Sequence, residues 1–384
     1  MERPGPSAAH LEDVNPETTE NGTVSRRTFG PAAVFCAWLG FLICLVYFAG
    51  ALVNAPPPWQ RVTSNWDTGW YLTIVNDGYQ TAVNGETNLA FFPLYPLVIR
   101  LLTKLGPDPV AAGVAFSLTC FLGALFLLRT LVAEKVSEQV ARHTLLLLVF
   151  WPFSFFFGLV YTESLFLLLV VGAFFFVHRR HWWLAAACAG LAGATRAVGI
   201  FVAVAVVLAY FEKEWSPTVK KSATILGLAA AGLSGLGAFM VFLKVHTGDF
   251  LAFLEAQRFW PNRANGISGL RSIPTVLQTR PSATWDFALV VIYMVPMVLF
   301  VVLCVYVLVK IDVVWGGFCL LALLAPVPTG SLASTNRYVL ALFPCFVAAA
   351  KLLGDRAVVA AAASAGLLGL FAYHYTYHTG TFIG

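Results

Sequence analysis

Residues 31–53 read PAAVFCAWLGFLICLVYFAGALV, an apolar run of 23 residues without a charged side chain. A helix of about 20 such residues crosses the hydrocarbon core of a bilayer. Arg26 and Arg27 directly precede the run and superficially resemble a twin-arginine export signal. The run is too long for the apolar part of a signal, and no small-residue cleavage site follows. We therefore interpret it as a first membrane span, anchored on its cytosolic side by the two arginines.

The rest of the chain has the same apolar character. Hydrophobic residues make up 59% of the 384 residues and charged residues 11%, with a mean hydropathy of +0.78. A soluble domain carries about 25% charged residues, so the composition indicates a multi-span membrane protein. In such a protein Lys and Arg report orientation first. The net charge of +5 therefore gives no reason to expect a nucleic-acid partner.

Apolar runs of roughly 15–25 residues recur along the chain and predict an all-α fold with about eleven transmembrane helices. These runs are 31–53, 110–132, 142–160, 163–178, 182–195, 197–211, 222–243, 285–309, 313–330, 336–352 and 357–373. Residues 1–30 lack apolar periodicity and are expected to form a disordered cytosolic tail, followed by one domain over residues 31–384. With the tail inside, the inner connections carry Lys or Arg, and the two long loops, 54–109 and 244–284, fall outside.

The seven cysteines give no sign of a metal or redox site. All lie in apolar runs, and none has a CxxC partner or a histidine at metal-ligand spacing, so we interpret them as small buried hydrophobic residues. The outer loops contain no Asp-x-Asp pair and no His, Cys or carboxylate cluster. The sequence therefore predicts no cofactor and no obligatory metal.

The first outer loop contains the segment SNWDTGWYLTIVNDGY, residues Ser64 to Tyr79. Trp66, Trp70 and Ile74 recur at four-residue spacing, which gives one face of a helix an apolar and aromatic character. The segment is too short to span a bilayer, and tryptophan and tyrosine favour the headgroup region. We predict an amphipathic helix on the outer interface, ended by Gly78.

Three charged residues have both a structural and a functional interpretation. Asp67 follows Ser64 by three residues, so it could complete a capping box at a helix N-terminus, a role that is compatible with acting as a base. Arg196 lies alone between two short apolar runs, where an unpaired arginine costs about 2.5–3.5 kcal/mol. A salt bridge would explain it, as would a cation facing an outer cavity. Arg337, in STNRY, could be an interfacial anchor or a phosphate ligand.

Five motifs follow one another along the chain: WDTGWYL…GY, ETNLAFFPLYPL, WPFSFFFGLVYTESLF, ATRAVGIFV and STNRYVLALFP. Over roughly residues 31–350 this ordered set resembles the PIG-V-like family, the GPI mannosyltransferase that adds the second mannose and its prokaryotic relatives. The resemblance implies a C-type (GT-C) glycosyltransferase. Such enzymes are multi-span helical bundles that use a polyprenyl-phosphate sugar and place an acid of the first outer loop at the reaction centre. In this chain we expect that loop to contain interfacial helices.

The resemblance also implies roles for particular residues. Asp67 matches the aspartate of the family's Trp-Asp motif, and Glu86 matches the acid before Ala-Phe-Phe-Pro. Glu163 matches the acid of the Tyr-x-Glu-Ser motif, and Arg196 the basic residue after Ala-Thr. Where eukaryotic members read Arg-Ser-Asn-Gly, this chain has Ala and Val at positions 197 and 198, which changes the polar contacts that would select the sugar or the acceptor.

The expected chemistry is a single-displacement transfer with inversion. A carboxylate takes the proton of the acceptor hydroxyl while cations stabilise the departing phosphate. The candidate catalytic residues are Asp67 and Glu86, and the candidate ligands of the donor phosphate are Arg196, Arg337 and Arg258. The candidate substrate-binding residues are Trp66, Tyr71, Asn88, Tyr161, Glu163 and His246. Helix capping is the structural alternative for Glu163, and a lone histidine such as His246 is more often structural.

The sequence thus predicts a mannosyltransferase-like enzyme that moves a sugar from a polyprenyl-phosphate donor to a hydroxyl of a lipid-linked or glycan acceptor. The reaction would take place on the outer side of a bilayer, a bacterial plasma membrane rather than the ER. A transporter or flippase of a lipid-linked solute is the main alternative. The polar side chains gather in the outer loops and no paired halves are evident, which argues against a carrier. A third alternative is a scaffold subunit, in which Asp67 would be dispensable.

Overall fold

The computed structural model describes residues 30–52, 66–81, 87–214, 216, 218–259, 284–326 and 335–379. Within these ranges the chain is helical and has no β-strand, so the predicted all-α fold is confirmed. The predicted disordered tail, apart from Gly30, lies outside the described residues.

Every predicted span contains an α-helix. These helices are α1 (Pro31–Leu52), α5 (Pro109–Lys135), α6 (Glu138–Val149), α7 (Glu163–His178), α8 (Trp182–Gly193), α9 (Ile200–Glu214), α10 (Val219–Thr247), α13 (Thr284–Lys310), α14 (Val313–Leu324), α16 (Phe343–Leu352) and α17 (Asp355–Thr379). Some of them are shorter than predicted: α6 ends at Val149 within the run 142–160, and α16 begins at Phe343 within the run 336–352. Among the described residues, α5 and α10 are the two helices long and apolar enough to cross a membrane by length and composition. The number of about eleven crossings therefore stays a prediction.

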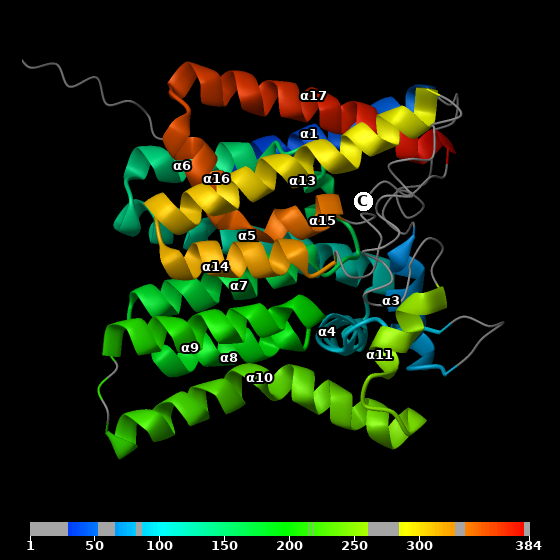
Figure 1. Cartoon of the computed structure of the whole chain (residues 1–384). Helices are drawn as coiled ribbons and strands as arrows, with labels where there is room; N and C mark the ends of the chain where they lie inside the picture. Colours follow the sequence, from blue (N-terminus) through cyan, green and yellow to red (C-terminus); the bar gives the residue numbers. More distant parts are fainter. Residues whose placement is uncertain are drawn as a thin grey trace, which may run out of the picture.

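The helices lie side by side in one bundle, with α7 in its interior (Figure 1). Most side chains of α7 are buried along its whole length, from Glu163 to Val177. On one side α10 packs closely against α8, because a Cβ on Gly235 would lie 1.9 Å from the carbonyl oxygen of Gly190. Small residues thus let two backbones approach, as is common between membrane helices.

The short elements gather at one end of the bundle. They are α3 (Asp67–Asp77), α4 (Leu94–Thr103), α11 (Ala252–Glu255) with η3 (Ala256–Phe259), η2 (Ala197–Gly199) and α15 (Thr335–Tyr338) with η5 (Val339–Ala341). In Figure 1, α3, α4 and α11 lie towards the right-hand end. The predicted end of α3 at Gly78 is confirmed, since Gly78 is its C-cap with φ 86°. The predicted outer loops thus contribute α3, α4, α11 and η3 to this end, and η2, α15 and η5 come from the connections between other helices.

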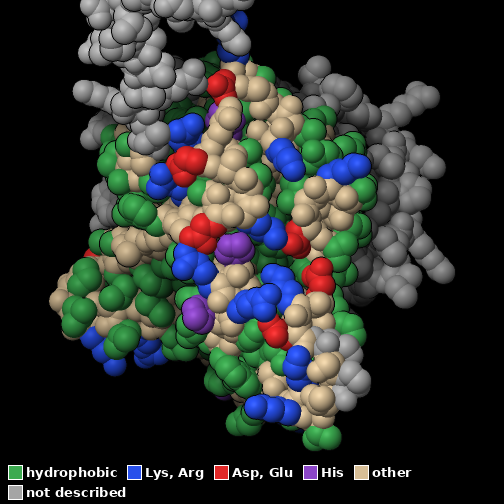
Figure 2. Space-filling model, turned by 90° about the vertical axis from the view of Figure 1, so that its left-hand side faces the viewer, with side chains coloured by type: hydrophobic (Ala, Val, Ile, Leu, Met, Phe, Trp, Pro, Cys, Tyr) green, Lys and Arg blue, Asp and Glu red, His purple; other side chains and the backbone are tan. Residues whose placement is uncertain are grey.

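The opposite end of the bundle carries a dense set of charged side chains (Figure 2). Ion pairs connect helix ends there: Arg129 with Glu138 at 2.6 Å, Lys135 with Asp312 at 2.8 Å, Arg180 with Glu214 at 2.9 Å, and Arg179 with Glu134. These pairs tie α5 to α6 and α14, and the turn after α7 to α5 and α9. At this end the charged side chains therefore pair with one another across neighbouring helices. We call it the ion-pair end.

The first outer loop is locked to the bundle by aromatic packing. Trp70 of α3 stacks on Phe91 at 6.0 Å between ring centroids, and Phe92 packs on Phe239 of α10 at 4.8 Å and on Phe253 of α11 at 5.5 Å. The amide of Leu94, at the start of α4, donates to the carbonyl oxygen of Ala194 at 3.0 Å. The Phe-Phe-Pro motif therefore joins α3 to the chain segment that carries Arg196.

Candidate active site

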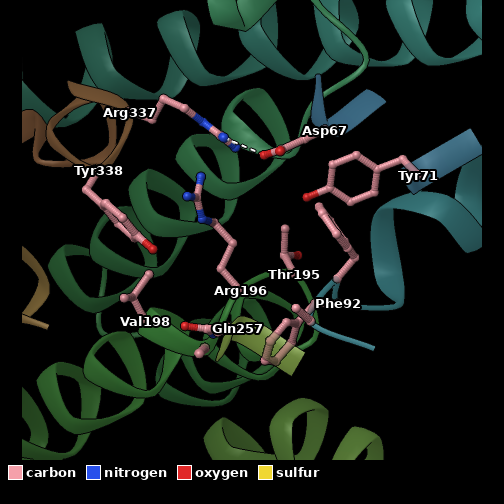
Figure 3. Close-up of a pocket in the computed structure, with 12 residues that line it drawn as sticks. Asp67, Tyr71, Phe92, Thr195, Arg196, Val198, Gln257, Arg337 and Tyr338 are labelled. Carbon is pink, nitrogen blue, oxygen red and sulfur yellow. Dashed lines mark hydrogen bonds and ion pairs between the residues drawn. The ribbon is translucent and has the colours of Figure 1, made fainter. Parts of the chain in front are cut away.

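A pocket of about 100 Å³ opens among these short elements (Figure 3). It is lined by residues from α3, the Phe-Phe motif, the turn between α8 and α9, η3 and α15: Asp67, Tyr71, Ala90, Phe91, Phe92, Thr195, Arg196, Ala197, Val198, Gln257, Arg337 and Tyr338. Three of the sequence-predicted charged residues, Asp67, Arg196 and Arg337, thus meet at one cavity. Residues far apart in the sequence form a single candidate site.

Asp67 is the first residue of α3, and its carboxylate faces Arg337. The Nη1 of Arg337 donates to the Oδ2 of Asp67 at 2.5 Å, and the backbone amide of Asp67 donates to the hydroxyl of Tyr161 at 3.1 Å. The N-cap position of α3 is Trp66, with φ 56° and no side-chain capping bond. The capping-box alternative is wrong for Asp67, because the helix begins too late for Ser64 to cap it. A positive φ at Trp66 is strained for a non-glycine residue. The chain changes direction at this residue, directly before Asp67 begins α3.

Glu163 connects the two arginines. Its Oε1 accepts from the Nε of Arg337 at 2.6 Å and from the Nη1 of Arg196 at 2.8 Å. The Glu163 side chain is 1% exposed, against 25% for Asp67. Glu163 is the first residue of α7, and its N-cap Thr162 makes no capping bond. The negative charge of Glu163 therefore pairs with the two arginines. The Glu163 side chain does not line the main pocket.

Aromatic rings complete the environment of both guanidinium groups. The Cζ of Arg337 lies 4.6 Å from the ring centre of Tyr161 and 5.3 Å from that of Phe156. The Cζ of Arg196 lies 5.0 Å from the ring centre of Tyr338. Cation–π contacts of this kind offset part of the cost of removing a guanidinium from water. Arg337 is 5% exposed, so the alternative of an exposed interfacial anchor does not describe it.

The chain turns sharply where it presents Arg196. The Arg196 amide donates to the carbonyl oxygen of Ala192 at 3.0 Å, and η2 follows directly. A Cβ on Gly199 would lie 2.4 Å from the backbone of Ala192, so only glycine allows this approach. The Arg196 side chain is 14% exposed and lines the pocket. Arg196 therefore forms a salt bridge and also faces a cavity, so the two interpretations do not exclude each other.

Tyr71 lies beside the site with its hydroxyl group buried. The Tyr71 hydroxyl lies 3.5 Å from the hydroxyl of Thr162, and Tyr71 is 5% exposed. Burial, with the nearby charge of Glu163, raises the pKa of Tyr71, since burial disfavours the phenolate. Tyr71 can therefore orient other groups through its hydroxyl but does not supply a negative charge.

Four other candidates lie apart from this arrangement or cannot be placed. The side-chain amide of Asn88 bonds within its own loop, to the carbonyl oxygen of Gly78 at 3.1 Å and the amide of Gln80 at 2.9 Å. His246 is exposed near the end of α10 and does not line the pocket. The backbone of Arg258 belongs to η3, but its side chain and the whole of Glu86 lie outside the described residues.

The pocket includes side chains that the sequence analysis did not select. Thr195 and Tyr338 line it, and each directly neighbours one of the two arginines along the chain. Gln257, from the second outer loop, lines it from below in Figure 3. The signal that could have identified Thr195 and Tyr338 is their position beside an arginine at the end of a short apolar run.

One grouping of cysteines was also missed. Cys304, Cys319 and Cys345 come from α13, α14 and α16, and their sulfur atoms lie within 4.8 Å of one another. All three are fully buried. Among the described residues this is the one group of at least three His, Cys, Asp or Glu side chains close enough to hold a metal ion. None of the three lines the pocket, and buried thiols in apolar surroundings behave as small hydrophobic groups.

Comparisons with known proteins agree with the geometry. Residues 59–246 match the family model described as Mannosyltransferase (PIG-V). The fold is similar to that of ArnT from Cupriavidus metallidurans bound to undecaprenyl phosphate, with a TM-score of 0.51 at 12% identity. The aligned region covers 85% of this chain and 61% of ArnT. The apo state of that protein gives a TM-score of 0.49 at 13% identity, with the same coverage.

A comparison with curated protein sequences finds no match. The family match over residues 59–246 agrees with the predicted resemblance to the PIG-V mannosyltransferases. The likeness to ArnT, at 12% identity, supports the predicted GT-C-like helical fold. The chain spans about three fifths of the length of ArnT.

Proposed function

We propose that this membrane glycosyltransferase, PIG-V-like in sequence and GT-C in fold, moves a mannose-like sugar from a polyprenyl-phosphate donor to a hydroxyl of a lipid-linked or glycan acceptor. The observation that carries the proposal is the chain of charges Asp67, Arg337, Glu163 and Arg196 around a pocket at one end of an apolar bundle. A carboxylate and two arginines at a cavity are the groups that a transfer away from a phosphate requires.

In the proposed reaction Asp67 is the general base. It is the one carboxylate of the network that lines the pocket and contacts solvent, with 25% of its side chain exposed. Asp67 takes the proton of the acceptor hydroxyl as the hydroxyl oxygen bonds to the anomeric carbon. The bond from that carbon to the phosphate oxygen breaks, and its electron pair stays with the phosphate. Attack opposite the phosphate inverts the anomeric centre.

The two arginines bind the phosphate of the donor in the proposed reaction. Guanidinium groups match phosphate oxygens with a rigid fork of donors, and both Arg196 and Arg337 line the pocket. In a site largely removed from water, such donors stabilise the negative charge that develops on the leaving phosphate. One oxygen of each carboxylate, Oδ2 of Asp67 and Oε1 of Glu163, bonds to a guanidinium group. In the proposed chemistry the two arginines stabilise the charge of the leaving phosphate.

A second cavity supports a lipid donor. A groove of about 290 Å³ lies between α9 and α14 and is lined almost entirely by apolar side chains, among them Phe201, Leu208, Phe318 and Leu321. A small pocket lined by Arg196, Val198 and Ala322, among others, also includes a residue of α14 and lies beside η2, which directly precedes α9. A polyprenyl chain in this groove would place its phosphate at the arginines. The similar ArnT structure is bound to undecaprenyl phosphate, which agrees with this class of donor.

The charge distribution supports an outer site and a cytosolic N-terminus. The ion-pair end carries Arg129, Lys135, Arg179 and Arg180, and Lys or Arg near short loops favours the cytosolic side. The pocket lies at the opposite end. We propose a bacterial plasma membrane, whose polyprenyl-phosphate sugars are presented at its outer surface.

Labelling of introduced cysteines tests this orientation. In a background without reactive native thiols, cysteines at Asn84 and Asn265, in the two predicted outer loops, should react with an impermeant maleimide on intact cells. A cysteine at Ser137, the N-cap of α6 at the ion-pair end, should stay unlabelled until the cells are opened. The reverse pattern would move the pocket to the cytosol, where nucleotide sugars are the available donors.

A transfer assay tests the reaction itself. Purified protein in proteoliposomes is supplied with polyprenyl-phosphate mannose carrying a radiolabelled sugar, together with lipid extract as the source of acceptor. The proposal expects the label to move to a new product, and expects nucleotide-linked mannose to give none. Movement of the intact labelled lipid across the bilayer without a new product would instead favour the carrier alternative.

A further inference from the structure

Arg337 is shared between the base and the site of the phosphate. Its Nε donates to Glu163 at 2.6 Å, and its Nη1 donates to Asp67 at 2.5 Å. The pocket beside it is lined by both Arg337 and Asp67. A phosphate that enters this pocket and bonds to Arg337 therefore meets an arginine that already has a carboxylate partner.

The two ion pairs of Arg337 are not equivalent. Glu163 is 1% exposed and also holds Arg196, so its pair with Arg337 is buried on every side. Asp67 is 25% exposed and stands at the start of a short helix. Breaking the deeper pair would leave buried charges without a partner, which costs several kcal/mol. The ion pair between Arg337 and Asp67 is therefore the one that can break with the smaller loss of free energy.

We propose that the lipid phosphate displaces Asp67 from Arg337, so that one arginine holds the base at rest and the phosphate during the reaction. This inference rests on the proposed function. Glu163 is then a positioning residue, because it keeps the guanidinium in place while its partner changes. The Oδ2 of Asp67, occupied by Arg337 at rest, becomes available to the acceptor hydroxyl only after the donor has bound.

Charge counting agrees with this exchange. At rest the two acids and the two arginines balance, so the network is neutral. A sugar phosphodiester adds one negative charge, which requires a cation that is not already neutralised. After transfer the proton of the hydroxyl is on Asp67, and the electron pair of the broken bond gives the polyprenyl phosphate a second negative charge. Arg337 then lies between a neutral Asp67 and a phosphate with two negative charges, so its stronger ion pair is with the phosphate.

The test measures binding of undecaprenyl phosphate to the purified protein, with undecaprenol as the uncharged control lipid. Asp67→Asn removes the competing charge but keeps the size of the side chain, whereas Asp67→Glu keeps the charge. We expect Asp67→Asn to bind the phosphate at least about 10-fold more tightly than the wild type, the order of one charge-assisted contact. Asp67→Glu should show no such gain. Asp67→Asn combined with Arg337→Gln should lose it.

The outcomes separate the inference from the proposed function. Equal or weaker phosphate binding by Asp67→Asn, with clear binding by the wild type, overturns the shared arginine and leaves the polyprenyl-phosphate donor in place. Failure of every variant to prefer undecaprenyl phosphate over undecaprenol overturns the donor class and the inference with it. If Asp67→Asn does not fold, Asp67→Ser removes the same charge at the same helix start and carries the same expectation.

Discussion

Both ends of the bundle hold ion pairs of similar length, yet these pairs do different things. At the ion-pair end, Arg180 and Glu214 meet at 2.9 Å with 65% and 26% of their side chains exposed. At the pocket end, Arg337 and Glu163 meet at 2.6 Å with 5% and 1% exposed. Exposed pairs contribute about 0–1 kcal/mol, whereas removing one partner of a buried pair costs about 3–5 kcal/mol. Burial, and not the distance between the charges, sets the importance of each pair.

The difference also separates stability from function. Charges at the ion-pair end are satisfied by one another across neighbouring helices, and water screens what remains. Charges at the pocket end are held in an apolar bundle, where they are costly unless every partner is present. The presence of two arginines and two acids at such a place agrees with the proposed phosphate site. The following predictions test this contrast, from the largest expected effect to the smallest.

Asp67→Asn should reduce sugar transfer by about 10²–10⁴-fold, because the proposed base is lost, while the thermal unfolding temperature changes little. The matched control is Asp77→Asn, an exposed carboxylate at the other end of the same helix, which should leave the rate unchanged. Rates from the proteoliposome assay and unfolding curves of the same preparations give the answer. A fully active Asp67→Asn variant would remove the base assignment.

Glu163→Ala should lower the free energy of unfolding by about 3–5 kcal/mol, because it leaves Arg196 and Arg337 buried without their acid. The measurement is the thermal midpoint of the purified protein in detergent. Adding Arg196→Ala to this variant should recover part of the loss, since one uncompensated charge disappears with it. A Glu163→Ala protein as stable as the wild type would contradict the contrast between the two ends.

Arg196→Ala should raise the apparent KM for the polyprenyl-phosphate donor by roughly 10–100-fold, the range expected for a hydrogen bond to a charged group. Arg196→Lys should recover only part of this loss, because lysine lacks the planar fork. Donor titrations at a fixed acceptor concentration measure the effect. If Arg196→Ala leaves the donor KM unchanged and lowers only the unfolding temperature, Arg196 is a salt-bridge residue alone.

Arg180→Ala should have the smallest effect, a loss of less than about 1 kcal/mol in the free energy of unfolding. Because its pair with Glu214 is exposed, the loss should shrink further at high salt. Transfer activity should be unchanged. A loss as large as that of Glu163→Ala would show that both ends of the bundle depend on ion pairs to the same degree.

The sequence predicted the helices better than the site. Long apolar runs leave few choices for a backbone that has no water to bond to, and helices occur at every predicted run. The end of α3 was predictable because Gly78 favours the left-handed C-cap. The capping box at Ser64 was not borne out, because the strained turn at Trp66 moves the helix start to Asp67. A local pattern could not indicate that strain.

The pairing of the site residues required the folded chain. Asp67 and Arg337 are 270 positions apart, and neither motif indicates the other. The resemblance named Glu163, but the sequence suggested a substrate contact or a helix cap. In the fold its Oε1 is occupied by two arginines. The three cysteines of α13, α14 and α16 converge for the same reason. Contacts between helices distant in sequence are set by packing and leave no local trace.

The way the chain holds Arg196 has a consequence for how the protein can change over evolution. The turn is fixed by backbone atoms, through the bond from Leu94 to Ala194 and the close contact of Gly199 with Ala192. Side chains 197 and 198 line the pocket yet take no part in that support. The resemblance gives Ser-Asn at these two positions in eukaryotic members, whereas this chain has Ala-Val. Neither pair alters the backbone contacts that hold Arg196. We therefore expect substitutions at positions 197 and 198 to alter the choice of sugar or acceptor while the backbone contacts keep Arg196 in place.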